Sequence, residues 1–173
     1  MFNLVRPFVE LCIFRIGPQN LPMSVLLLAL VLTAHTAMSI VGFTFLMAGP
    51  DAIFAGMLGT LLLCALTYST LFVLRRQLRW VQTLTALAGA ITILDLLGLP
   101  FATWLRSTHE AGLNSGIPMF IMMILIGWQV TVQGHILRHA MSLPMTLGLM
   151  VSMFYFAISV SVLQSLFTPA TGP

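Results

Sequence analysis

Five long stretches without a charged residue constrain this chain more than any other feature. No Asp, Glu, Lys or Arg occurs in residues 16–50, 52–74, 80–94, 111–137 and 139–173. A soluble core helix does not need 20 or more consecutive apolar residues, whereas a helix that crosses the hydrocarbon core of a bilayer does. The fold class that we predict is therefore an all-α integral membrane protein, with five transmembrane helices in a bundle.

The composition excludes an ordinary soluble fold and a nucleic-acid-binding protein. Charged residues make up 6% of the chain, against about 25% in an average soluble domain. The seven basic residues are all Arg and stand at the edges of the apolar stretches, where they are explained by membrane topology. We therefore expect the lipid bilayer as a partner, and no nucleic acid.

The charge-free stretches predict two regions. Residues 1–17 have a narrow polar stripe at helical spacing, with Arg6 and Glu10 four residues apart, and we interpret them as a short interfacial amphipathic helix; the alternative is a frayed lead-in to the first span. Residues 18–173 form the five-span membrane domain, with a polar loop at 106–116. The predicted spans are about 22–48, 52–74, 80–104, 117–137 and 143–167.

The distribution of Arg predicts the orientation. An N-terminus in the cytoplasm places every Arg except Arg106 on the cytoplasmic side, which satisfies the positive-inside rule. Five spans then place the C-terminus outside, so we expect a multi-pass protein with a cytoplasmic N-terminus and an outer C-terminus.

Small residues line one face of the second predicted span. Ala52, Gly56 and Gly59 recur at helical spacing, and smooth faces of this kind let helix backbones approach closely in lipid. We interpret the face as a packing surface. The pattern is compatible with packing inside the chain and with contact to another subunit.

Asp95 is the most informative single residue, because a carboxylate inside a span costs roughly 2.5–3.5 kcal/mol on insertion scales. At about 1.5 Å per residue, Asp95 and His35 lie roughly 22 Å and 20 Å from the same membrane side. A hydrogen bond or ion pair between them is therefore geometrically allowed. The pair is interpreted either as a buried polar clamp or as a proton-sensitive relay.

The fourth predicted span carries two sets of polar residues. Gln129 and Gln133 form a polar helix face, which is typical of contacts between helices and alternatively lines a substrate path. A neighbouring interface stripe contains Trp128, His135, Arg138 and His139. Two His four residues apart can bind a metal in principle, but no third ligand stands nearby in the sequence. We expect no metal, no other cofactor and no catalytic residue.

Two short elements, GPQNLP at 17–22 and GHILRHA at 134–140, accompany the five closely spaced spans. In these features the chain resembles a group of small proteobacterial inner-membrane proteins whose topology is similar to that of the Ypt-interacting-protein (Yip) family. The resemblance implies a five-span membrane fold and a bacterial inner membrane, in which the outer C-terminus is periplasmic.

Two functions from different classes follow from these patterns. The first is a non-enzymatic scaffold, assembly factor or accessory subunit, which acts through helix–helix contacts with another membrane protein or in a homo-oligomer. The alternative is a small transporter or proton-linked carrier that uses the intramembrane residues Asp95 and His35.

Overall fold

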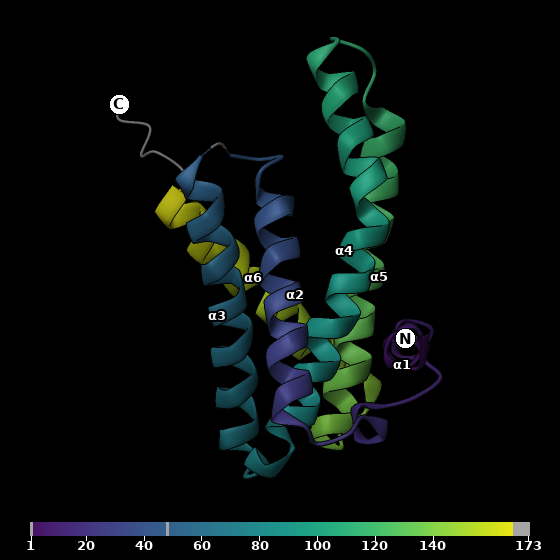
Figure 1. The fold of residues 1–173 in the computed structure, drawn as a ribbon, viewed down its shortest axis with the longest axis vertical. Coiled ribbons are helices and arrows are strands. Elements are labelled where there is room, and N and C mark those ends of the chain that lie inside the picture. The colour runs from purple at the N-terminus through teal and green to yellow at the C-terminus, as the bar shows by residue number, and fades with distance from the viewer. Residues whose placement is uncertain (1, 48, 168–173) are drawn as a thin grey trace.

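The computed structural model describes residues 2–47 and 49–167, and within them the chain is an all-α bundle without strands (Figure 1). Five of its helices are long and apolar enough to cross a membrane. The helices are α1 (Phe2–Cys12), α2 (Val25–Phe43), α3 (Pro50–Val73), α4 (Trp80–Glu110), α5 (Gly116–Met141) and α6 (Met145–Phe167), with short 3-10 turns η1 (Pro18–Asn20) and η2 (Gln77–Arg79).

The long helices run alternately up and down, so the bundle has two ends (Figure 1). We call the end that carries Arg75, Arg76 and Arg79 the basic end, and the end where residues 111–115 join α4 to α5 the hairpin end. Towards the hairpin end, α4 and α5 extend beyond the ends of α2, α3 and α6 (Figure 1). The hairpin-end halves of α4 and α5 therefore form an arm that projects beyond the rest of the bundle.

Helix α4 is the centre of the bundle, because it packs against α1, α2, α3 and α5. All residues from 83 to 91 are buried. Most of these residues, including Thr85, Ala88 and Gly89, are small, so neighbouring helices can approach α4 from several sides at once.

Helix α1 lies across the side of the α4–α5 pair and is seen end-on in Figure 1. Its buried side chains are Phe8, Leu11 and Cys12, whereas Val5 and Val9 are exposed. Arg6 donates to Glu10 at 2.8 Å, as the four-residue spacing predicts. The helix ends at Cys12, several residues before the predicted boundary at 17.

The predicted and observed boundaries of the spans differ most at α4. The loop predicted at 106–116 is wrong in its first part, which is helical. The helix continues to Glu110, because Arg106 pairs with Glu110 at 2.7 Å and the hydroxyls of Ser107 and Thr108 bond to carbonyls one turn back. It ends where Gly112 adopts a φ of 65° and the next amide bonds back to Thr108, a left-handed cap that favours glycine.

Candidate functional site

A cleft separates the hairpin-end half of α2 from the arm formed by α4 and α5. It has a volume of about 980 Å³ and is lined by residues of α2, of the segment that follows α2, of α4 and of α5. Most of the lining is apolar. The apolar side chains include Met38, Phe43, Leu94, Leu99, Met119, Met122, Leu125 and Ile126.

A second, smaller cavity adjoins the cleft inside the bundle, and we call it the inner chamber. Its volume is about 200 Å³ and its lining includes His35, Gln133 and Tyr155. Asp95 and Gln129 line both the cleft and the chamber. The two spaces therefore meet at this acid–amide pair. All four intramembrane polar residues predicted from the sequence, Asp95, His35, Gln129 and Gln133, line the cleft or the chamber.

The hydrogen-bond partner of Asp95 is Gln129 of the neighbouring helix α5. Gln129 Nε2 donates to Asp95 Oδ1 at 3.4 Å. The direct bond between Asp95 and His35 that the depth argument allows is not formed. His35 is 5% exposed, and its Nδ1 is buried without a hydrogen-bond partner. The two residues face a shared chamber rather than each other.

Asp95 also has no ionic partner within residues 2–47 and 49–167. The ion pairs found there are Arg6–Glu10 and Arg106–Glu110, each within a single helix. An amide donor stabilises a carboxylate but does not neutralise its charge. The carboxyl group of Asp95 is therefore a charge-bearing group at membrane depth that the described part of the chain leaves uncompensated.

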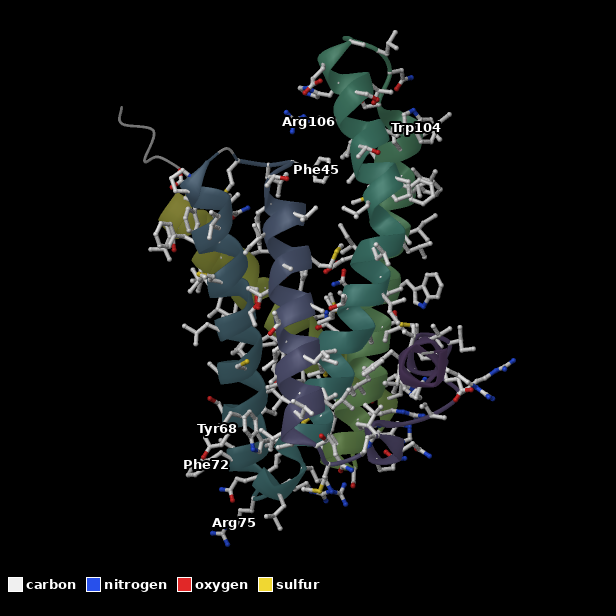
Figure 2. The ribbon with its side chains drawn as sticks, viewed as in Figure 1. Phe45, Tyr68, Phe72, Arg75, Trp104 and Arg106 are labelled. Carbon is white, nitrogen blue, oxygen red and sulfur yellow. The ribbon has the colours of Figure 1, made fainter. Side chains whose placement is uncertain are left out.

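Arg106 closes part of the mouth of the cleft at the hairpin end. Its side chain points from α4 towards the end of α2 near Phe45 (Figure 2), and its Nη1 donates to the carbonyl of Thr44 at 3.3 Å. The same guanidinium is paired with Glu110. One cation thus bridges the two walls of the cleft above Asp95.

The interface stripe on α5 is used to hold the N-terminal segment. Trp128 Nε1 donates to the carbonyl of Cys12 at 3.0 Å, and His135 Nε2 lies 3.1 Å from the carbonyl of Ile16. The ring of His139 packs edge-on against that of His135 at 4.7 Å. Arg138, the fourth member, places its Cβ beside Gly148 of α6. Within residues 2–47 and 49–167, no cluster of His, Cys, Asp and Glu is suited to a metal ion.

The small residues of α3 pack inside the chain. Ala52 and Gly56 are buried, and a Cβ atom on Gly56 would lie 2.7 Å from the backbone nitrogen of Ile40 in α2. Gly59 is less closely covered, since its nearest contact would be Phe43 at 3.9 Å. The sequence left open whether this face packs inside the chain or against another subunit. In the structure the face packs inside the chain, between α2 and α3.

Tyr155 is a site residue that the sequence analysis did not single out. It lies in α6 and lines the inner chamber, while its hydroxyl group bonds to the carbonyl of Leu66 at 2.7 Å and to Thr70 Oγ1 at 2.8 Å. A phenol in the middle of an apolar span is the signal that points to it, because a buried tyrosine needs a hydrogen-bond partner.

Fold and composition together define the class of a multi-pass helical membrane protein. No family model, curated protein or solved structure matches the chain. Its function is therefore inferred from the cleft, the chamber and the residues between them.

Proposed function

We propose that the protein is a small proton-linked carrier in which Asp95 is the coupling group. The observation that carries the proposal is the position of Asp95, which lines both the cleft and the chamber and, in the described part of the chain, has the amide of Gln129 as its one hydrogen-bond partner. Ionisable residues that face a cavity inside a membrane typically mark an ion or substrate path.

The energetic argument concerns the charge of Asp95. A carboxylate at membrane depth is costly, and no cation within residues 2–47 and 49–167 forms an ion pair with Asp95 to offset the cost. A proton or a positively charged solute from the cleft supplies that compensation. Because each neutralises the same group, binding of one disfavours binding of the other, and this competition is the basis of coupling.

The inner chamber extends the polar path beyond Asp95. His35 is buried with a free ring nitrogen, and Gln133 lies on the same chamber. An imidazole nitrogen without a hydrogen-bond partner can accept a proton from a neighbouring acid and return it. His35 is the residue that we assign to proton exchange on the chamber side of Asp95.

A scaffold or accessory subunit is the second candidate function. Its main motivation in the sequence was the small-residue face, and the burial of Ala52 and Gly56 against α2 supports an intramolecular role for that face. The observation that still favours it is the arm of α4 and α5, which extends beyond its neighbours (Figure 1). Recovery of a stable heteromer or homo-oligomer in mild detergent supports this alternative.

The arrangement in the membrane is part of the proposal. The cluster Arg75, Arg76 and Arg79 at one end supports a cytoplasmic basic end under the positive-inside rule. The C-terminus and the mouth of the cleft are then periplasmic. The resemblance to small proteobacterial proteins of Yip-like topology supports a bacterial inner membrane.

Proteoliposomes with a trapped pH-sensitive dye test the carrier proposal. We expect at least one member of a panel of small cations, anions and neutral solutes to change the internal pH when it is added to vesicles that contain the wild-type protein. Asp95→Asn abolishes this response, because the amide has nearly the same shape but cannot bind a proton at neutral pH.

The matched control is Asp51→Asn, which changes an exposed acid in the first turn of α3 and leaves the response intact. Reconstituted protein is checked for equal insertion and helix content. A wild-type protein that moves no proton with any solute contradicts the proposal, and so does an undiminished response in Asp95→Asn.

A further inference from the structure

The shape and lining of the cleft indicate the kind of molecule that it takes. Its volume of about 980 Å³ lies at the upper end of the range of sites for drug-sized ligands. The walls are apolar and include Met38, Met119 and Met122, whose flexible, polarisable side chains adapt to ligands of irregular shape. A ligand with a bulky apolar body fits these walls better than a small hydrated ion.

The formal charge of the cleft favours a monovalent cation. Two acids, Asp95 and Glu110, and two bases, Arg106 and His109, line it, and His109 is neutral in the formal count at pH 7. Glu110 and Arg106 are already paired at 2.7 Å. The negative charge of the Asp95 carboxylate remains unpaired. Binding of one monovalent cation therefore makes the formal charge of the occupied cleft zero.

Aromatic residues add to this preference. Phe43 lines the cleft and the chamber, and Phe45 lies at the mouth (Figure 2). The faces of such rings attract organic cations, and the attraction grows when water is excluded. The path from the mouth towards Asp95 therefore passes two aromatic rings.

We propose that the cleft binds a monovalent organic cation with an apolar body, whose charged group lies at Asp95 and whose body rests against the methionine-rich walls. The assignment rests on the proposed function, because it names the solute class of the same site. Arg106 narrows the entry for the ligand, since its bond to Thr44 crosses part of the mouth.

Proton competition gives the binding a defined pH dependence. Protonation of Asp95 removes the charge that holds the cation, so affinity falls as the pH is lowered through the titration of this group. Other charged or titratable groups line the two spaces and contribute to the profile; they are His35, Tyr155, Arg106, His109 and Glu110. Because this profile has several contributors, the assignment to Asp95 is made by comparing variants at one pH.

Tetraphenylphosphonium is a suitable probe, because it is a monovalent cation inside an apolar shell. We expect radiolabelled probe to bind the full chain in lipid nanodiscs in a saturable manner. Asp95→Asn weakens binding about tenfold or more, whereas Asp95→Glu retains most of it and Asp51→Asn is unchanged. Tetraphenylborate, an anion of the same shape, is titrated in a separate sample, because the two ions would pair if mixed, and it shows no saturable binding.

A second variant locates the probe in the cleft without touching the acid. Ala102 is half-buried on the cleft wall, so Ala102→Phe reduces the free volume and weakens binding of the bulky probe. Ala111→Phe, on the exposed turn at the end of α4, is the control and has no effect on binding.

Equal binding by wild type and Asp95→Asn overturns the assignment, as does equally tight binding of tetraphenylborate in its own titration, which indicates that charge does not select the ligand. Absence of any saturable binding overturns it too and indicates a cleft filled by lipid chains. If a different solute still drives Asp95-dependent proton movement, only the cation assignment fails. If Asp95-dependent binding occurs without proton movement in liposomes, the carrier proposal fails and the ligand class stands.

Discussion

The spacing between α2 and α3 is set by a single residue, Gly56. Its Cα faces the backbone of Ile40, and a Cβ atom there would lie 2.7 Å from the Ile40 nitrogen and 2.9 Å from its Cα. Backbone cannot rotate away as a side chain can. One turn along the same interface, Thr36 donates to Thr60 at 3.0 Å, a bond that requires this close approach.

We predict that Gly56→Ala destabilises the protein by about 1–3 kcal/mol, the usual cost of overpacking a well-packed contact. The free energy of unfolding is measured by denaturation in mixed detergent micelles. Gly59→Ala is the matched control, since its Cβ would meet Phe43 at an ordinary 3.9 Å and the change leaves stability nearly unaltered. Equal stabilities of the two variants contradict the role assigned to Gly56.

At the polar site, the sequence predicts the depth of single residues in the membrane but not their hydrogen-bond partners. The depth of Asp95 and His35 follows from counting residues along each span, and the structure places both on one chamber. The bond of Asp95 to Gln129 does not follow from depth, because it depends on how each helix is rotated about its axis. That rotation is decided by packing of all neighbours together, which local periodicity does not contain.

The docking of helix α1 depends on a notch at Gly89 in α4. A Cβ on Gly89 would overlap the ring of Phe8, and next to it the Cys12 thiol contacts the carbonyl of Ala90 at 3.6 Å. Burial raises the pKa of the Cys12 thiol to about 11. Since the thiolate is the reactive form, docked α1 keeps Cys12 unreactive at neutral pH.

We therefore predict that displacing α1 exposes Cys12 to alkylation. In a Cys64→Ala background, Cys12 is the one remaining thiol, and iodoacetamide labels it slowly at pH 7. The rate rises as the pH approaches 11, because the folded protein then begins to form thiolate. Gly89→Leu forces Phe8 out of its notch and raises the rate at pH 7 towards that of the denatured chain.

Gly127→Leu is the control for this experiment, because a Cβ there meets nothing within 4 Å. Its labelling rate at pH 7 equals that of the Cys64→Ala parent. Rapid labelling of the parent itself shows that α1 leaves α4 freely, and it removes the basis for treating α1 as a fixed part of the bundle.

The elements differ in how well the sequence predicts them. The five long helices were predictable because transfer of an apolar stretch into lipid is a local property of about 20 residues. The extension of α4 to Glu110 was missed, because the polar residues after Trp104 resemble a loop by composition. Their helix is held by side-chain bonds such as Arg106–Glu110, whose four-residue spacing was the available signal.

At the scale of the whole molecule, the bundle is tight at the basic end and divided at the hairpin end. Near the basic end, α5 and α6 meet so closely that a Cβ on Gly148 would lie 2.8 Å from Cβ of Arg138. At the hairpin end, the cleft parts α2 from the α4–α5 arm. The bond from Arg106 to Thr44 links the two sides across the mouth. The hairpin-end half of α2 and the α4–α5 arm are thus two walls of the cleft that are joined at the basic end.

A carrier needs such a mouth to open and close, and the Arg106 bond makes this testable. Spin labels at the exposed residues Leu46 and Leu113 report the distance across the mouth. We predict that Arg106→Ala shifts the distribution to longer distances, because loss of a charge-assisted hydrogen bond of about 1.5–3 kcal/mol changes an open–closed equilibrium by tenfold or more. A label pair at Leu78 and Thr146 on the basic end is unchanged.

The same pair of labels separates a moving carrier from a rigid groove. In the wild type, closed and open populations coexist when the difference in free energy between them is a few kcal/mol or less, and Arg106→Ala then redistributes them. A single narrow distance that is identical in both proteins means that the walls do not move. The cleft would then bind a ligand from one side only, and Asp95 would have no route by which to exchange its proton with the other.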